Sequence, residues 1–353
     1  MTEGIASSAG TSKVRQRVSS ILLRVVLLAV AVLLLRRELD GVGFNGLLTS
    51  IRDYKASRIE LGIAFTAASF LTLGVFEVLA LRYVGKRAER IIPRRTALAT
   101  SFVASAYSQS VGLAILTGTA VRLRSYSRYG LDALDVARLS VFVTATATLG
   151  LLTTGGFAFF TTAGRIFLLG APRSLAPLGI LLLIPIVGYL AWGAFGNSDF
   201  YGRGRWRIRR PVLRVALQQI GVSSLDWALA GTVLFVLLPR SLHLSYGDLL
   251  GIYLVAQTAA VLSHVPGGLG VFEAVVIGLV AMNVDNRLDP AAVAASVAAA
   301  LLVYRIIYYL LPFCAAIALS VSAEVIRSRS TAGAPHPTAA RTPIPNPLAP
   351  DAI

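Results

Sequence analysis

The chain has 353 residues, of which 56% are hydrophobic and 14% charged, and its formal net charge at pH 7 is +16. Soluble domains are roughly half apolar and about a quarter charged, so this composition predicts an integral membrane protein. Nucleic-acid binding is not expected, because the arginines gather in short loops between apolar segments and form no basic stripe with interleaved aromatics. The single cysteine, Cys314, excludes a disulfide framework, and no Cys/His spacing indicates a metal or another cofactor.

Six apolar segments are long enough to cross a bilayer, which takes about 17 to 25 helical residues. In chain order they are 19–35, 59–81, 131–153, 178–196, 212–238 and 290–322. Arg24 interrupts the first, and no small-residue cleavage site follows, so we interpret it as a retained helix and not as a signal peptide. The predicted fold is an all-α, polytopic membrane helix bundle over residues 19–325, with a cytoplasmic segment before it (1–18) and a disordered Pro-rich tail after it (326–353).

Two further apolar segments, 96–121 and 249–282, are rich in Ser, Thr, Gln and Gly, and a Pro-Gly-Gly sequence interrupts the second. We interpret each as a helical hairpin that enters the membrane and leaves on the same side. With a cytoplasmic N-terminus, the inside loops then hold 19 Lys and Arg and the outside loops 9. This bias agrees with the positive-inside rule, whereas a single crossing by 96–121 would place the basic stretch 202–210 outside. Both termini are therefore expected in the cytoplasm.

The order of sequence features also predicts two repeats, 59–165 and 212–322. Glu77 is followed by Gln109 and Asp226 by Gln257 at nearly the same spacing, and each Gln precedes a Gly-interrupted stretch and an LDxxxVA pattern. Three crossings would separate the helices of Glu77 and Asp226, so the halves would have opposite orientation. Inverted repeats with broken helices near the membrane midplane are a recurrent transporter architecture.

Several ionisable residues lie within the apolar segments, where a charge costs about 2.5 to 3.5 kcal/mol on an insertion scale. Besides Arg24, which can snorkel to the surface, they are Glu77, Asp226, His264, Glu273 and Arg305. One interpretation is that they form buried ion pairs that fix helix packing, for example between Glu273 and Arg305. The other is that they line a polar cavity for a charged substrate.

The interruption at 263–276 supplies several candidate binding residues. Gly267, Gly268 and Gly270 permit φ angles that other residues avoid, and a half-helix beginning near Leu269 would direct free N–H groups at an anion such as a phosphate. Glu273, within the first turn of that helix, could neutralise this end instead, and both alternatives stay open. His264 could relay protons, although a lone His in a helix break more often satisfies backbone groups.

Two other groups are candidates for contact with lipid headgroups. Tyr304 and Tyr308 share a helical face with i, i+4 spacing beside Arg305, and they could help to hold a lipid phosphate or act as interfacial anchors. Arg122 and Arg124 could capture anionic headgroups or belong to an ordinary positive-inside loop. Catalytic motifs such as HExxH, GxSxG and a Walker loop are absent from the sequence, so no enzymatic activity is expected.

Four segments together resemble one known family. They are SHVPGGLGVFEAVV, TGTAVRLRSYSRYGLDALDVARL, DWALAGTVLFVLLP and LLVYRIIYYLLP. Over residues 15–325 the chain resembles the N-terminal transmembrane half of the lysylphosphatidylglycerol synthetase/flippase family, also called multiple peptide resistance factor. This resemblance implies a bacterial inner-membrane protein that moves aminoacylated phosphatidylglycerol between leaflets and so repels cationic peptides. The aminoacyl-tRNA-dependent synthase domain of full members is missing, so lipid synthesis is not expected.

The leading hypothesis is therefore a flippase for anionic or aminoacylated phosphatidylglycerol, such as lysylphosphatidylglycerol. Arg305 and the half-helix end would hold the phosphate, and Glu273, Asp226 or Glu77 would meet the amines. One alternative is a membrane scaffold or partner subunit for a separate aminoacyl-phospholipid synthase, and another is a carrier of small anions. Passive or ion-coupled movement is expected in the absence of an ATP site, and a homo-oligomer is compatible with the sequence.

Overall fold

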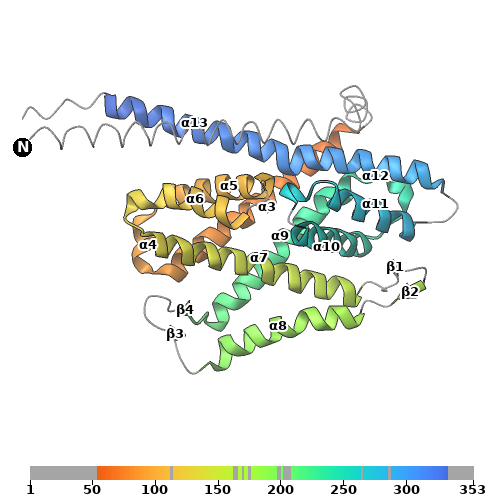
Figure 1. The fold of residues 1–353 in the computed structure, drawn as a ribbon, viewed down its shortest axis with the longest axis horizontal. Helices are drawn as coiled ribbons and strands as arrows, with labels where there is room; N and C mark the ends of the chain where they lie inside the picture. Colours follow the sequence, from red (N-terminus) through yellow and green to blue (C-terminus); the bar gives the residue numbers. More distant parts are fainter. Residues whose placement is uncertain are drawn as a thin grey trace, which may run out of the picture.

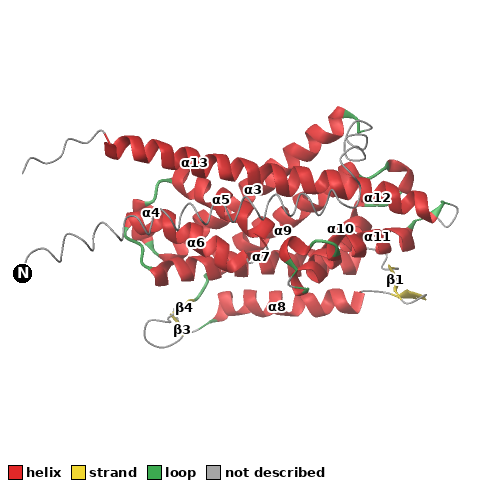
Figure 2. Ribbon diagram, turned by 45° about the horizontal axis from the view of Figure 1, so that its top comes forward, coloured by secondary structure: helices red, strands yellow, loops and turns green. Residues whose placement is uncertain are grey.

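The computed structural model describes residues 54–111, 114–161, 166–168, 171–173, 176–196, 200–201, 208–263, 265–284 and 288–332. Helices make up almost all of this part of the chain, which confirms the predicted all-α bundle (Figure 1, Figure 2). The first expected crossing, 19–35, and its Arg24 lie outside the described residues.

Five helical segments are long and apolar enough to cross a membrane, and they confirm the five later crossings predicted from the sequence. They are α3 (Ala56–Val84), α7 (Ala133–Thr161), α8 (Ala176–Phe195), α9 (Leu213–Leu237) and the continuous run formed by α12 (Pro290–Tyr304), the π-helix η5 (Arg305–Leu310) and α13 (Leu311–Ala332). Large apolar side chains on their outer surfaces are exposed, among them Leu71 and Val187. Exposed apolar side chains on membrane-crossing helices are what lipid contact requires.

The two predicted hairpins are pairs of short helices. The first consists of α5 (Arg94–Val111) and α6 (Ala114–Tyr126), and the second of α10 (Tyr246–Leu262) and α11 (Val271–Asn283). With 13 residues each, α6 and α11 reach only about 20 Å at 1.5 Å per residue, which is less than a bilayer core. The helices of each pair pack together: a Cβ on Gly118 would lie 2.9 Å from the Ser108 hydroxyl, and the rings of Tyr253 and Phe272 are 5.7 Å apart.

Elements recur in the same order in the two halves, namely a long helix, a pair of short helices and a long helix. The first long helices, α3 and α9, pack side by side and antiparallel (Figure 1). Arg58 near the start of α3 donates to the carbonyl oxygen of Leu238 after the end of α9, whereas Leu79 and Val215 line one pocket at the opposite ends. Opposite directions of these corresponding helices are what inverted repeats require.

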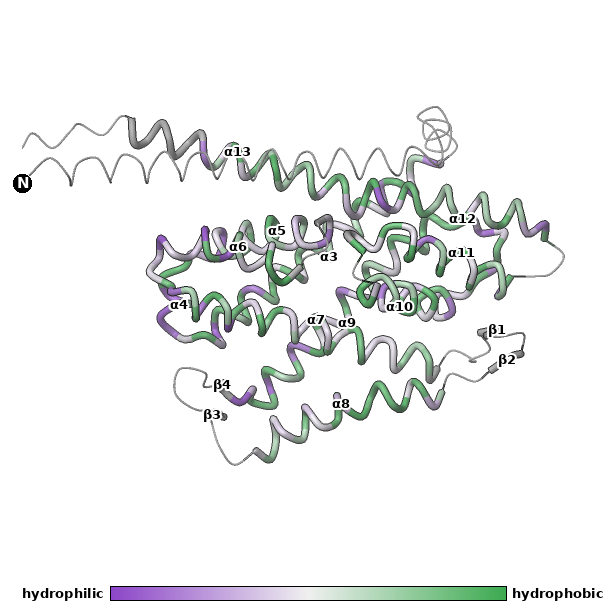
Figure 3. The backbone as a smooth tube through the Cα atoms, in the orientation of Figure 1, coloured by the Kyte–Doolittle hydropathy of each residue, from purple (hydrophilic) through white to green (hydrophobic). Residues whose placement is uncertain are grey.

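Several basic segments lie at one end of the bundle, where hydrophilic colouring recurs near α4, α6 and β4 (Figure 3). Arg124 in the last turn of α6 forms an ion pair with Glu324 of α13, and Arg82 and Arg214 line a common pocket. The sequence topology assigned all of these segments to the cytoplasmic side. Their common location is consistent with that assignment, while the direction of the chain across the membrane stays a prediction.

Short helices and two pairs of short strands complete the fold. They are α4 (Lys86–Ile91), η1 (Ser127–Tyr129), η3 (Arg240–Leu242), η4 (Pro266–Gly268), and the antiparallel strand pairs β1 (Ile166–Leu168) with β2 (Ala171–Arg173) and β3 (Phe200–Tyr201) with β4 (Ile208–Arg209). The small strand pairs flank α8 and were not expected.

Three details differ from the sequence expectations. Helix α13 continues to Ala332, so residues 326–332 are helical and do not belong to the tail. The half-helix of the second hairpin begins at Val271 and not near Leu269, because Gly270 has a positive φ and acts as its N-cap. A π-helix interrupts the last crossing at Arg305, where a regular α-helix was assumed.

Candidate functional site

The break between α10 and α11 is built from backbone conformations that favour glycine. Gly267 and Gly268 have φ of 64° and Gly270 has φ of 79°, as the sequence predicted. A Cβ on Gly268 would lie only 2.5 Å from the Cβ of Ala260 on α10, so the chain folds back tightly against the preceding helix. His264, a candidate proton relay, lies outside the described residues.

One guanidinium group, that of Arg305, holds this break. Its Nε donates to Glu273 Oε1 at 2.6 Å, and its Nη1 donates to the Gly267 carbonyl oxygen at 2.8 Å. The side chains of Arg305 and Glu273 are 8% and 19% exposed, so the pair is largely shielded from solvent. The predicted ion pair is therefore confirmed, and Arg305 ties the π-helix both to the break at Gly267 and to α11 at Glu273.

Glu273 also caps the helix that it begins. Its second oxygen, Oε2, accepts a hydrogen bond of 2.8 Å from the Gly270 N–H. A carboxylate in this position satisfies an otherwise unpaired donor and opposes the positive end of the helix dipole. Of the two alternatives left open by the sequence, neutralisation by Glu273 is the one present in this conformation.

Aromatic rings surround the Arg305 guanidinium. Its central carbon lies 4.6 Å from the centroid of the Tyr309 ring and 5.4 Å from that of Phe272, within the range of cation–π attraction. Tyr304 and Tyr308 stack with centroids 5.3 Å apart, which confirms their predicted common face. The insertion of a π-turn here is notable because π-turns within α-helices are frequent at functional sites.

A second buried ion pair lies in the first half of the chain. Arg122 of α6 shares its single Nε–H between both carboxylate oxygens of Glu77 on α3, at 3.0 Å each, and donates a further hydrogen bond from Nη2 at 2.9 Å. Tyr126 adds a hydrogen bond of 2.8 Å from its hydroxyl to the same carboxylate. Among the described residues, each half thus contains an Arg–Glu pair that is largely shielded from solvent.

Asp226, at the middle of α9, has a different environment. Ser69 and Thr72 of α3 lie with their hydroxyl oxygens 2.6 Å and 2.8 Å from its Oδ1. The Ser69 hydroxyl is also 3.0 Å from the hydroxyl of Tyr308. Within the described part of the chain, Asp226 forms no ion pair with Lys, Arg or His.

The structure separates the sequence candidates into three groups. Arg305, Glu273, Tyr304, Tyr308 and the glycines of the break form one cluster, and Tyr308 links it through Ser69 to Asp226. Glu77 and Arg122 form their own closed pair, and Arg124 lies at the surface with Glu324, where their side chains are 46% and 37% exposed. No cluster of three His, Cys, Asp or Glu side chains suitable for a metal occurs among the described residues.

Some contacting residues were not singled out from the sequence. Ser69 and Thr72 lie one turn apart on α3, and a pair of hydroxyls at this spacing in an apolar segment was a usable signal. Phe272 and Gln257 were not recognisable as site residues, because their roles depend on contacts across helices. Gln257 donates to the hydroxyls of Tyr253 and Tyr309 at 3.0 Å and 3.2 Å.

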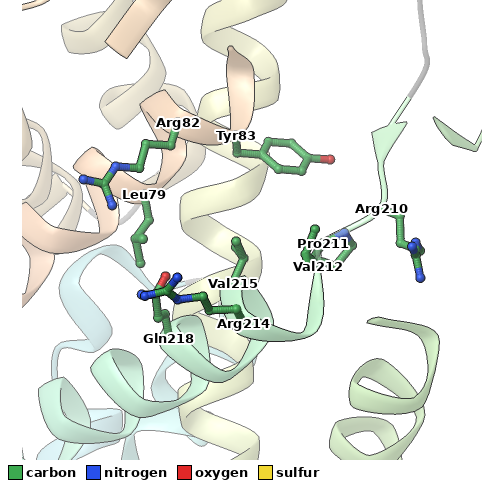
Figure 4. A pocket seen from close by; sticks show the side chains of 9 residues that line it. All are labelled: Leu79, Arg82, Tyr83, Arg210, Pro211, Val212, Arg214, Val215 and Gln218. Atoms are coloured by element: carbon green, nitrogen blue, oxygen red, sulfur yellow. The ribbon is translucent and has the colours of Figure 1, made fainter. Parts of the chain in front are cut away.

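A basic pocket lies at the end of the bundle where the Arg-rich loops meet. Its volume is about 350 Å³, and its lining comes from the last turns of α3 and the start of α9, as Figure 4 shows: Leu79, Arg82, Tyr83, Arg210, Pro211, Val212, Arg214, Val215 and Gln218. Three guanidinium groups and no carboxylate line it, which favours an anionic ligand. The sequence identified Arg210 only as part of a positive-inside loop.

Comparison with known proteins places the chain among bacterial membrane proteins. It is 34% identical over 318 residues to the uncharacterized protein slr0712 of Synechocystis, a match that covers 89% of this chain and 94% of the relative. It is 30% identical over 290 residues to the inner membrane protein YbhN of Escherichia coli, covering 80% and 86% of the two chains. No family model matches the chain.

More distant relatives carry a functional name. The phosphatidylglycerol lysyltransferase of Staphylococcus aureus is 24% identical over 320 residues, which are 87% of this chain. That of Bacillus subtilis is 21% identical over 293 residues. The chain spans about a third of the length of these enzymes, 35% and 31% respectively.

Proposed function

The chain belongs to the family of multi-pass membrane proteins that includes slr0712 and YbhN, and we propose that it moves phospholipids between the leaflets of a bacterial inner membrane. The proposed substrates have a phosphatidylglycerol-type headgroup, anionic or aminoacylated. The distant relatives named phosphatidylglycerol lysyltransferase support this choice, since their name specifies that lipid. The synthase activity in their name is not part of the proposal.

The observation that carries the proposal is the position of Arg305 at the glycine break. A guanidinium binds carboxylates and phosphates in the same forked geometry, so a lipid phosphate can take the place of Glu273 as the acceptor. The N–H of Gly270 and the first turn of α11 would then face the same anion. Irregular backbone at membrane depth is tolerated where it lines a protein cavity, which fits this role.

An aminoacylated headgroup can exchange with both members of the ion pair. Its phosphate would bind Arg305, and its ammonium group would bind the Glu273 carboxylate that the phosphate displaces. Because an unpaired charge in a shielded site is costly, the internal pair would reform when the lipid leaves. When no lipid is bound, Arg305 and Glu273 thus neutralise each other, and the headgroup site needs no external ion.

The test is a leaflet-exposure assay with the purified chain in phospholipid vesicles. Fluorescent phosphatidylglycerol and its lysyl derivative are placed in both leaflets, and a membrane-impermeant quencher reports the rate at which inner-leaflet lipid becomes accessible. Arg305→Ala should lower the rate for both lipids by about tenfold or more, the size expected for loss of a charge-assisted contact. Glu273→Gln should lower the rate selectively for the lysyl lipid.

Two further variants serve as controls. Arg138→Ala removes another ion-paired arginine, bound to Asp135 within α7 and partly exposed, and should leave the rates unchanged. The double variant Arg305→Ala with Glu273→Ala removes both charges, so it avoids the unpaired carboxylate that could unfold the single variant. Unchanged exchange in a folded double variant would refute the role of this site. No exchange by the wild-type chain would favour a scaffold or partner subunit.

A further inference from the structure

The carboxylate of Asp226 lies deep within the bundle. It is 13 residues from the start of α9 and 11 from its end, a depth of about 20 Å and 16 Å at 1.5 Å per residue. Asp226 is only 8% exposed, and its neighbours Ser69 and Thr72 occupy the middle of the antiparallel helix α3. The side chain therefore lies where the two halves of the chain meet, near the middle of the crossing.

The hydrogens around this carboxyl group can be counted. Four short contacts join five oxygens: Asp226 Oδ1 with Ser69 Oγ (2.6 Å) and Thr72 Oγ1 (2.8 Å), Ser69 Oγ with Tyr308 OH (3.0 Å), and Thr72 Oγ1 with the Ser69 carbonyl (2.6 Å). The three hydroxyls supply one hydrogen each, and the carbonyl only accepts. A fourth hydrogen on the carboxyl group completes the set.

With that hydrogen in place, each contact has one donor. In this protonated form Tyr308 donates to Ser69, Ser69 donates to Asp226 and Thr72 donates to the Ser69 carbonyl oxygen. The carboxyl group then donates to Thr72, whereas in the ionised form Thr72 donates to Asp226. In the ionised form, one hydroxyl hydrogen would have to be shared between two contacts. The network thus has room for a proton on Asp226.

The electrostatic surroundings of Asp226 also favour its protonated form. Glu77 and Glu273, the other shielded carboxylates discussed above, each have an arginine partner, whereas Asp226 has no cation within ion-pair distance among the described residues. The groups that face it are hydroxyls: Ser69 and Thr72 from α3 contact it directly, and Tyr308 from η5 contacts Ser69. Tyr253 of α10 is near enough to interact with it electrostatically. An ionised carboxylate without a counter-ion is expensive in such surroundings.

The same network reaches the headgroup site. Tyr308 contacts the Asp226 network through Ser69, and three residues earlier in the same π-helix Arg305 holds Glu273 and Gly267. A change in the Tyr308 hydrogen bond therefore acts on the short segment that positions Arg305. A π-turn and an α-helical turn are alternative conformations of the same residues, so this segment can switch between two backbone arrangements.

We propose that Asp226 is a proton-binding site whose loading is coupled to lipid movement. In the state described here the carboxyl group carries the proton; when the site opens, its O–H bond breaks, the proton passes to a water molecule, and one negative charge stays on Asp226. The proposed ligand of the Asp226 site is a single proton. The coupling rests on the proposed lipid movement, whereas the proton site itself does not.

Infrared difference spectroscopy of the purified chain in lipid tests the proton site directly. A titration with alkali should remove a carbonyl-stretch band of a protonated carboxylic acid, and Asp226→Asn should abolish that band. Asp135→Asn, which changes a partly exposed carboxylate on α7, should keep it. A wild-type chain with no such band, or a band that persists in a folded Asp226→Asn variant, would overturn the assignment.

The vesicle assay tests the coupling separately. If one proton accompanies each lipid, a gradient of one pH unit can support up to about a tenfold difference in lipid distribution between leaflets. The wild-type chain should create this asymmetry, and Asp226→Asn should not. An asymmetry that follows a sodium gradient and ignores pH would overturn the proton assignment. A titratable band without any lipid exchange would support the proton site and refute the proposed function. Lipid exchange that does not depend on pH, in a chain without the band, would support the proposed function and refute the proton site.

Discussion

Arg122 and Glu77 lie 45 residues apart in the sequence, yet their side chains form three hydrogen bonds of 2.9 to 3.0 Å in the interior of the first half. The Glu77 side chain is fully buried and that of Arg122 is 7% exposed. With the Tyr126 hydroxyl as a further donor, the carboxylate is satisfied within the protein. The pair joins α3 to α6 and thereby anchors the first hairpin.

We predict that Glu77→Ala strongly destabilises the protein. It leaves the Arg122 guanidinium buried without its counter-ion, a change that typically costs about 3 to 5 kcal/mol. Unfolding in mixed micelles with increasing SDS, followed by circular dichroism, measures the loss. The matched control is Glu89→Ala, which breaks an exposed ion pair with Arg82 and should cost less than about 1 kcal/mol.

A double variant that lacks both charges tests whether loss of the ion pair causes the destabilisation. The double variant Glu77→Leu with Arg122→Met removes both charges at similar volume, and it should recover most of the stability lost in Glu77→Ala. Equal losses in the single and double variants would show that the ion pair is not the cause. Lipid exchange by the double variant would also show whether Glu77 and Arg122 act only in packing.

The sequence predicted much of this architecture because membrane helices obey simple constraints of length and hydropathy. The 178–196 segment became α8 at Ala176–Phe195, and the Pro-Gly-Gly interruption became the break between α10 and α11. The distribution of Lys and Arg among the loops also favoured a hairpin over a single crossing for the segment 96–121. Each of these signals is local in the chain.

The side-chain partners were harder to predict, because they depend on how helices rotate against one another. Glu273 with Arg305 was named in advance as a pair, but Glu77 and Arg122 were treated as separate candidates. The hydroxyl network of Asp226 needs the register of α3 against α9, which no pattern within either helix reveals. The π-turn at Arg305 likewise has no composition signal that distinguishes it from an α-helix.

Gly268 and Gly270 offer a matched pair of substitutions in the break. Both have positive φ, so alanine at either position is strained by about 1 to 3 kcal/mol. A Cβ at Gly268 would also collide with Ala260 at 2.5 Å, whereas a Cβ at Gly270 meets no atom within 4 Å. We therefore expect Gly268→Ala to lower the free energy of unfolding clearly more than Gly270→Ala. Equal effects in SDS unfolding would show that the tight fold-back onto α10 does not exist.

The contact between α7 and α9 includes one very close approach, at Gly150. A Cβ on Gly150 would lie 2.5 Å from the Cβ of Ser223 and 2.6 Å from its backbone carbon, so Gly150→Ala must push the two helices apart. Overpacking of this kind typically costs about 1 to 3 kcal/mol. Gly221→Ala, on the same helix as Ser223, meets no atom within 4 Å and should be neutral or stabilising by about 0.5 to 1 kcal/mol through higher helix propensity. Opposite signs for the two substitutions in SDS unfolding are the expected result, and a stabilised Gly150→Ala would mean that α7 does not pack against α9 at this position.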